Sequence, residues 1–154
     1  MRKLLTLCVI RQGDRALLGQ KKKGFGADLW NGFGGKLEEG ETLEESVVRE
    51  TKEEAGVVIR EFEKIGIMDF HLNNNPDILE VHIFSTSKFD GEPIETEEMR
   101  PKWFSIEDIP YNEMWADDIY WYPLFLEGKK FKGEFFFDED QKVLNYTLDK
   151  VESL

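Results

Sequence analysis

Short apolar segments separated by turn residues run along most of the chain, which is the pattern of β-strands joined by tight connections. Residues 4–10 are apolar and partly β-branched, so they predict a buried strand. The turn residues Gln12-Gly13-Asp14 follow, and residues 16–20 predict a return strand. We expect further strands at residues 59–68, 78–87 and 99–104, and a closing hairpin from residues 134–137 and 143–148.

The clearest helix signal lies between Thr42 and Gly56. Thr42 and Glu45 form a Thr-x-x-Glu capping box, and Gly56 stands where a C-terminal glycine cap belongs. The pattern therefore predicts a helix over residues 43–55.

A second helix is predicted over residues 117–127 from its apolar spacing, with Pro123 expected to kink or shift it. Residues 24–40 are rich in glycine and predict a loop. Strands and helices that mix without strict alternation favour an α/β (α+β) fold, with helices packed on a mixed sheet.

Three glutamates of the first helix do not follow the pattern of a solvated surface. At about 100° per residue, Glu50 and Glu54 share the sector of Leu43 and Val47, which should face the interior, and Glu53 lies beside it. Crowded carboxylates repel one another and resist desolvation, and a divalent cation removes both costs. The alternative is a helix with ordinary surface glutamates in a glutamate-rich chain.

Charge and composition narrow the classes of function. The 154 residues fit one domain, 1–154, and 20 Lys and Arg against 32 Asp and Glu give a net charge of −12. Such a surface repels nucleic-acid duplexes and anionic membranes, so neither is an expected partner. A small anionic ligand would need a local basic patch or a bound cation.

Cysteine and histidine usage excludes soft metal sites. Cys8 is the only cysteine, which rules out an internal disulfide framework, and two histidines leave hard, oxygen-liganded cations as the expected metals. The longest apolar run is far shorter than the roughly 18–20 residues that span a bilayer. We expect a cytoplasmic protein without a signal peptide, with nuclear or mitochondrial nucleotide pools as alternatives, and take a monomer as the default.

The helix lies within a segment, GGKLEEGETLEESVVRETKEEAGVV at residues 34–58, that resembles the Nudix box. The fixed positions of the box fall, in order, on Gly35, Glu41, Arg49, Glu50, Glu53, Glu54, Gly56 and Val57. Thr51 departs from the box, which usually has an aliphatic residue there, and we expect its methyl group to pack instead.

The resemblance extends over about residues 4–148 to one branch of this family, the animal MutT homologues. It rests on segments well outside the box: Lys21 to Gly26, Leu29 to Lys36, Glu98 to Pro101, Trp103-Phe104, Met114-Trp115, Asp117-Asp118 and Tyr120-Trp121. It implies a Nudix α/β/α sandwich with a central mixed sheet. The implied activity is hydrolysis of oxidised purine nucleoside triphosphates, such as 8-oxo-dGTP and 2-oxo-dATP, to the monophosphate and pyrophosphate. Such an enzyme sanitises the nucleotide pool and averts DNA damage.

The resemblance also implies the catalytic centre. Mg²⁺, with Mn²⁺ as a substitute, would be held by the Gly34 carbonyl and by Glu50, Glu53, Glu54 and Glu98. Arg49 completes the catalytic set, and Glu53 and Glu98 are both candidates for the general base. Metal charge and positioning are what in-line phosphoryl chemistry requires.

The implied substrate-binding residues are Thr6, Lys21, Asn31, Phe33, Gly34, Gly35, Lys36, Phe70, Leu79, Trp115, Asp117, Asp118 and Trp121. Trp115 offers the aromatic face that a purine needs, and Asn31 with the two aspartates offers hydrogen bonds to its edges. Neighbouring aspartates can share a proton, so that one donates to an oxo group and the other accepts from an N–H.

Plainer interpretations stay open for these residues. Trp115 and Trp121 fit core packing, Asp117 or Asp118 fits a helix N-cap, and Asn31 fits a turn. Lys21–Lys23 fits a solvated hairpin, so Lys36 is favoured over it for phosphate contact. The alternative activities are Nudix hydrolysis of ADP-ribose, dinucleoside polyphosphates or capped RNA. A binding module without turnover would have lost the metal-binding acids, which are present here.

Overall fold

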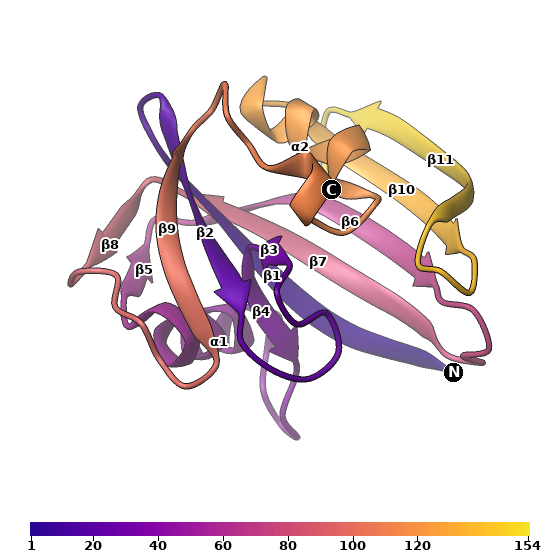
Figure 1. Ribbon diagram of the computed structural model, residues 1–154, viewed down its shortest axis with the longest axis horizontal. Coiled ribbons are helices and arrows are strands. Elements are labelled where there is room, and N and C mark those ends of the chain that lie inside the picture. The colour runs from indigo at the N-terminus through magenta and orange to yellow at the C-terminus, as the bar shows by residue number, and fades with distance from the viewer.

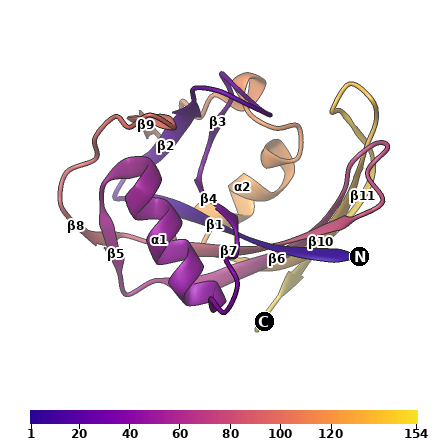
Figure 2. The same ribbon diagram turned by 90° about the horizontal axis from the view of Figure 1, so that it is seen from below.

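A mixed sheet runs through the molecule and separates two hydrophobic cores, one under each helix. The computed structural model describes residues 1–154, and Figure 1 shows helices α1 (Leu43–Ala55) and α2 (Asp118–Leu126). Seen from below, the two helices lie on opposite faces of the sheet (Figure 2), which confirms the expected α/β/α arrangement. Neither helix combines the length and the apolar character needed to cross a bilayer.

Nine strands form the main sheet, in the order β11-β10-β6-β7-β1-β2-β3, with β4 paired to β1 and β9 paired to β2. Their bounds are β1 (Arg2–Gln12), β2 (Arg15–Lys21), β3 (Trp30–Asn31), β4 (Phe33–Lys36), β6 (Glu63–His71), β7 (Ile78–Thr86), β9 (Met99–Ser105), β10 (Lys130–Phe137) and β11 (Val143–Val151). A small second sheet pairs β5 (Val58–Arg60) with β8 (Lys88–Asp90). A 3₁₀ turn, η1 (Tyr111–Glu113), precedes α2.

Two strands, β2 and β4, pair with different parts of the same edge of β1. We call the place where they diverge the fork, and it shapes the functional region. Residues 5–8 of β1 pair with β4, whereas residues 10–12 pair with β2. Beyond this point β2 leaves β1 and pairs with β3 and β9. The glycine-rich segment predicted as a loop therefore contains two short strands. A Cβ atom at Gly34 would lie 1.8 Å from the Thr6 carbonyl oxygen, so glycine is required for β4 to approach β1 this closely.

Local sequence signals account for α1. The Thr42 hydroxyl accepts from the Glu45 N–H, the Thr42 N–H donates to the Glu45 carboxylate, and Gly56 ends the helix at φ 76°, so both predicted caps are confirmed. Val47 packs in the core beneath the helix. Thr51 is fully buried as expected, and its hydroxyl donates to the Val47 carbonyl.

Other boundaries differ from the prediction. The strand predicted over residues 59–68 is two strands in different sheets, because Glu61 adopts a left-handed conformation (φ 47°) that breaks the extended chain. The strand β8 was not predicted, and β10 begins four residues before the predicted Glu134. Helix α2 contains Pro123 within its span and begins at Asp118.

Candidate active site

Helix α1 directs two of its three candidate acids toward the sheet. Glu54 is buried, and its carboxylate accepts a 3.0 Å hydrogen bond from the Gly34 N–H. The Glu50 carboxyl group lies against Gly35, where a Cβ atom would come within 2.9 Å of it. Glu53 is half exposed, with 49% of its side chain accessible. The helical periodicity therefore predicted the inward direction of Glu50 and Glu54 correctly.

Burial makes these carboxyl groups reluctant to ionise. It raises the pKa of Glu54 to about 8, and the charges of Glu50 and Glu98 add to this rise while the Gly34 N–H opposes it. Burial also raises the pKa of Glu50, against the attraction of Arg49. A group of acids that resist ionisation in this way is a place where a cation would be stabilised.

Arg49 binds the acids of this region together. Its Nε and Nη2 donate to the two carboxylate oxygens of Glu41 at 2.6 and 2.9 Å, and its Nη1 donates to Glu50 at 3.0 Å and Glu53 at 3.2 Å. The hydrogen bonds from Arg49 lower the pKa of Glu41 to about 2. Glu45, which lies one turn before Arg49, is instead hydrogen-bonded to the Thr42 N–H in the capping box.

The carboxylates alone do not form a complete metal-binding site. No three His, Cys, Asp or Glu side chains converge closely enough to hold a metal ion by themselves, because Glu50 and Glu53 are hydrogen-bonded to Arg49. The donors are nevertheless hard oxygens, and Mg²⁺ typically binds through one or two carboxylates together with the phosphates of a substrate. The arrangement therefore fits an ion shared between the protein and a phosphate ligand.

A cavity of about 200 Å³ lies on the other face of the fork, between β1, β7 and the start of α2. Apolar and aromatic side chains dominate its lining, which comprises Leu5, Thr6, Leu7, Phe25, Asn31, Gly34, Gly35, Phe70, Leu72, Leu79, Val81, Ile83, Trp115, Asp117, Asp118, Trp121 and Phe137. A concave apolar site with a few polar groups is typical of small-ligand binding.

Two buried aspartates supply the acidic groups of this cavity. Trp121 Nε1 donates to Asp117 Oδ2 at 2.7 Å, whereas Asp118 Oδ2 is buried without a hydrogen-bond partner. Burial raises the pKa of both groups, and the charge of Asp117 raises that of Asp118 further, well above its usual range. The pair thus offers a ligand one acceptor and one proton donor. Asp117 occupies the N-cap position of α2, as the plainer interpretation expected, but its side chain makes no capping hydrogen bond.

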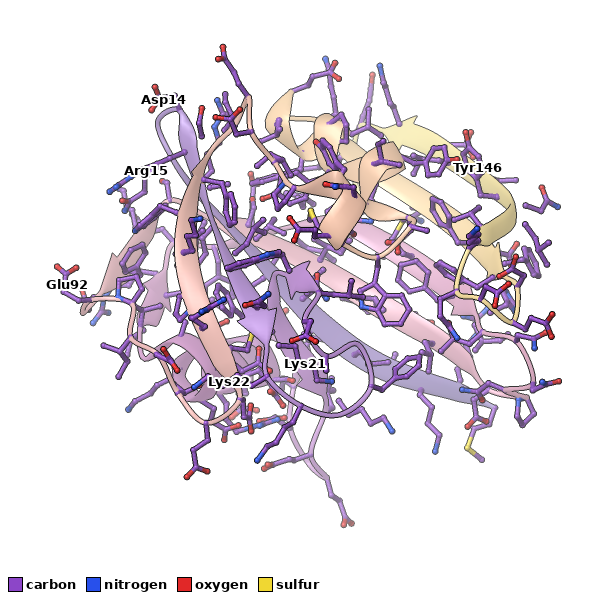
Figure 3. The ribbon with its side chains drawn as sticks, viewed as in Figure 1. Asp14, Arg15, Lys21, Lys22, Glu92 and Tyr146 are labelled. Carbon is purple, nitrogen blue, oxygen red and sulfur yellow. The ribbon has the colours of Figure 1, made fainter.

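A second, more polar cavity adjoins the first. Leu7, Phe25, Asn31, Gly34 and Trp115 line both cavities. The second one adds Glu54 and Glu98 with two lysines, Lys21 and Lys23. Figure 3 labels Lys21 at the end of β2. The two cavities therefore adjoin across these shared residues, and we refer to them together as the cleft, with buried aspartates in one cavity and carboxylates with lysines in the other.

Five predicted site residues line neither cavity of this cleft. Phe33 is fully buried in the core beneath α1, so its side chain is not available to a ligand. Lys36 is exposed and lines neither cavity, and only its carbonyl contacts Arg49, whereas Lys21 and Lys23 line the polar cavity. The preference for Lys36 as the phosphate contact stays a prediction. Arg49, Glu50 and Glu53 also line neither cavity.

Several lining residues were missed by the sequence analysis. Leu5 and Leu7 on β1, and Val81 and Ile83 on β7, alternate toward the cavity, so strand periodicity could have found them. Phe25 packs on Trp115 at 5.1 Å between ring centroids, a contact that no local signal predicts. Thr6 lines the cavity as expected, but its hydroxyl lies 3.2 Å from the Ser46 hydroxyl on α1.

Comparisons with known proteins agree with this architecture. Residues 1–125 match the model of the NUDIX domain. The chain is 47% identical to the oxidized purine nucleoside triphosphate hydrolase of Mus musculus, over 98% of this chain and 97% of that protein. It is 48% identical to the protein of the same name from Danio rerio, over 99% and 97%. A MutT protein from Bacillus halodurans has a similar structure, with a TM-score of 0.85 at 27% identity, covering 96% of this chain and 97% of that one.

Proposed function

The chain belongs to the NUDIX domain family, and from this premise we propose that it hydrolyses oxidised purine nucleoside triphosphates, such as 8-oxo-dGTP and 2-oxo-dATP, to the monophosphate and pyrophosphate. The observation that carries the proposal is the cleft, in which an apolar cavity containing Asp117 and Asp118 adjoins a polar cavity containing Glu54 and Glu98. One end suits a base and the other suits phosphates. The names of the mouse and zebrafish relatives support the same substrate class.

The base would be recognised by stacking and by the aspartate pair. Trp115 and Phe25 line the cleft where its two parts join, and stacking on an aromatic ring stabilises any purine. Asp118, which resists ionisation more strongly, would donate to an oxo group, while Asp117 accepts from an adjacent N–H. Adenine has no neighbouring oxo and N–H groups and guanine has one such pair, and oxidation adds a pair to either base. Recognition of the added pair by the two aspartates would favour oxidised bases.

The phosphates would lie in the polar cavity. Nudix hydrolases generally use a divalent metal. We propose Mg²⁺, with Mn²⁺ as a substitute, held by Glu54, Glu98 and Glu50 with Glu53 and the Gly34 carbonyl as further ligands. When bound, the ion would neutralise phosphate charge and polarise the phosphoryl group. Lys21 and Lys23 would contribute positive charge that the acidic chain otherwise lacks.

Hydrolysis would proceed by attack of water on the β-phosphorus. Glu98 is favoured over Glu53 as the general base, because Glu98 lines the cavity whereas Glu53 is directed to Arg49 at the surface. Arg49 would hold Glu50 in place through its hydrogen bonds. The leaving group is the nucleoside monophosphate, and pyrophosphate carries the oxygen of the attacking water.

Compartment and assembly stay predictions. We propose a small-molecule nucleotide as the partner, a cytoplasmic enzyme and a monomer. The buried, unpaired Cys8 is consistent with a reducing compartment.

The test is pyrophosphate release with Mg²⁺ from 8-oxo-dGTP, 2-oxo-dATP and dGTP at equal low concentration. Preference for either oxidised nucleotide supports the proposal. Turnover without preference would contradict the role of the aspartate pair. Faster turnover of ADP-ribose, a dinucleoside polyphosphate or capped RNA would favour the alternative activities, and no turnover on any of them would favour a binding module.

A further inference from the structure

The loop between β8 and β9, residues 91–98, ends at Glu98 and runs past the C-terminal end of α1 before β9 begins beside the end of β2 (Figures 1 and 2). Its first attachment is to the end of the helix. The Ile94 N–H donates to the Ala55 carbonyl at 2.9 Å. The Ile94 side chain packs on Gly56, where a Cβ atom would come within 2.5 Å of it.

The Thr96 hydroxyl makes the second attachment, and it involves the backbone of both acids that line the polar cavity. The hydroxyl donates to the Glu54 carbonyl at 3.0 Å. It accepts from the Glu98 N–H at 3.3 Å and from the Met99 N–H at 3.2 Å. The Thr96 N–H closes the turn by donating to the Met99 carbonyl at 2.9 Å. One oxygen atom therefore connects Glu54 on α1 with Glu98 on the loop.

A third attachment comes from the loop after β2. The Lys22 N–H donates to the Glu98 carbonyl at 3.0 Å, and the Lys22 ammonium pairs with Glu95. Figure 3 labels Lys22 beside Lys21 at the end of β2. The Lys22–Glu95 pair is largely exposed, and exposed pairs stabilise little. The hydroxyl of the half-buried Thr96 is thus the side-chain contact on which the placement of Glu98 depends most.

We propose that Thr96 is a positioning residue that holds Glu98 opposite Glu54 in the polar cavity. The proposal rests on the proposed function, because Glu98 acts there as a candidate metal ligand and general base. The side chain of Glu98 is exposed, so its own contacts do not fix it. Its backbone is fixed instead, because the Glu98 N–H donates to the Thr96 hydroxyl at 3.3 Å and the Glu98 carbonyl accepts from the Lys22 N–H at 3.0 Å. These contacts set the backbone position from which the carboxylate extends.

The first experiment measures order without metal or substrate. Amide hydrogen exchange over residues 91–99 is compared in the metal-free wild type, Thr96→Val and Thr96→Ser. Valine keeps the shape and removes the hydroxyl, whereas serine keeps the hydroxyl. We expect faster exchange in Thr96→Val and wild-type exchange in Thr96→Ser. Unchanged exchange in Thr96→Val would overturn the proposal.

The second experiment is a double-mutant cycle with Glu98→Gln, measured as kcat/KM on 8-oxo-dGTP. Removing the partner of a metal-site ligand typically costs about 10–100-fold, so we expect that loss for Thr96→Val and less than about threefold for Thr96→Ser. In the Glu98→Gln background Thr96→Val should cost no more than about twofold, because its effect passes through Glu98. An equal loss in both backgrounds would show a general structural effect and overturn the proposal.

Thr86→Val is the matched control. The Thr86 hydroxyl also donates to a carbonyl, that of Arg60, and accepts from the backbone N–H of Lys88, but Thr86 lines neither cavity of the cleft. We expect unchanged kcat/KM in this variant, and a loss equal to that of Thr96→Val would contradict a specific role. If the wild type turns over no oxidised nucleotide, the proposed function fails while the exchange experiment still tests the attachment of the loop.

Discussion

Replacing the two buried aspartates by asparagine, one at a time, tests whether they share a single proton. Burial raises the pKa of Asp117, and the 2.7 Å hydrogen bond that Asp117 accepts from Trp121 opposes this rise. Asp118 Oδ2 has no partner, and burial together with the charge of Asp117 raises the pKa of Asp118 well above its usual range. Of the two aspartates, Asp118 is therefore the one that resists ionisation more strongly.

The two substitutions should differ in magnitude. Asp118→Asn exchanges one neutral donor for another, and a neutral hydrogen bond contributes about 0.5–1.5 kcal/mol, so kcat/KM for 8-oxo-dGTP should fall by about tenfold at most. Asp117→Asn removes a charged acceptor, and such a hydrogen bond contributes about 1.5–3 kcal/mol, which corresponds to a loss of about 10–150-fold. Activity on dGTP should change less in both variants.

The pH dependence gives an independent readout. In the wild type, kcat/KM should fall as the pH rises through the pKa of Asp118, because the donor is lost and a second buried charge appears. Asp118→Asn should lack this fall, while any decline caused by the carboxylates at the other end of the cleft persists in both proteins.

The free energy of unfolding should also depend on the titration of Asp118. Between the pKa of an unfolded aspartate, about 3.9, and the raised pKa of Asp118, the folded state binds the extra proton, so the stability of the wild type decreases as the pH rises. Asp118→Asn should lack this decrease and should be more stable than the wild type at neutral pH. Kinetics and thermal denaturation across about pH 5–9 measure both effects. A larger loss for Asp118→Asn than for Asp117→Asn, or an unchanged alkaline fall, would refute the shared proton.

Four further predictions concern the rest of the cleft. Glu54→Gln should keep the hydrogen bond from Gly34 but lose about 10²–10³-fold in kcat, because metal-ion stabilisation of a phosphoryl transition state contributes several kcal/mol. Saturating Mg²⁺ should raise the Tm of the wild type by about 5–10 °C at 100 times its Kd and leave that of Glu54→Gln unchanged in differential scanning fluorimetry. Trp115→Ala should weaken binding of a non-hydrolysable 8-oxo-dGTP analogue by about 1–3 kcal/mol in calorimetry, and unchanged affinity would remove Trp115 from base recognition. Lys23→Ala should raise KM whereas Lys36→Ala should not, and the reverse order in steady-state kinetics would support the original preference for Lys36.

Features fixed by neighbours in sequence were predictable. The caps of α1 lie within four residues of the positions they bond, and the inward direction of Glu50 and Glu54 follows from helical geometry alone. Strand periodicity could likewise have predicted which alternate residues of β1 and β7 line the cavity. These parts of the fold and the site required no knowledge of how the chain closes.

Features set by contacts between distant segments were not predictable from local patterns. Arg49 is hydrogen-bonded to Glu41, eight residues away on the loop before the helix. Glu45, one turn before Arg49, is instead bonded within the capping box. Phe33 and Lys36 were assigned to substrate from the resemblance, but the pairing of β4 with β1 directs Phe33 into the core beneath α1. The tie between Thr96, Glu54 and Glu98 likewise depends on where the loop after β8 meets the helix.

Competition between nucleotides tests the central claim, that one cleft both selects an oxidised base and cleaves its triphosphate. The protein, Mg²⁺, a trace of 8-oxo-dGTP and a large excess of dGTP are mixed, and both monophosphates are quantified over time. The ratio of the two rates, divided by the ratio of the concentrations, equals the ratio of the kcat/KM values. We predict that the 8-oxo-dGMP fraction of the product far exceeds the 8-oxo-dGTP fraction of the starting mixture. Asp117→Asn should lose this preference. Consumption of the two nucleotides in proportion to their concentrations would contradict the account.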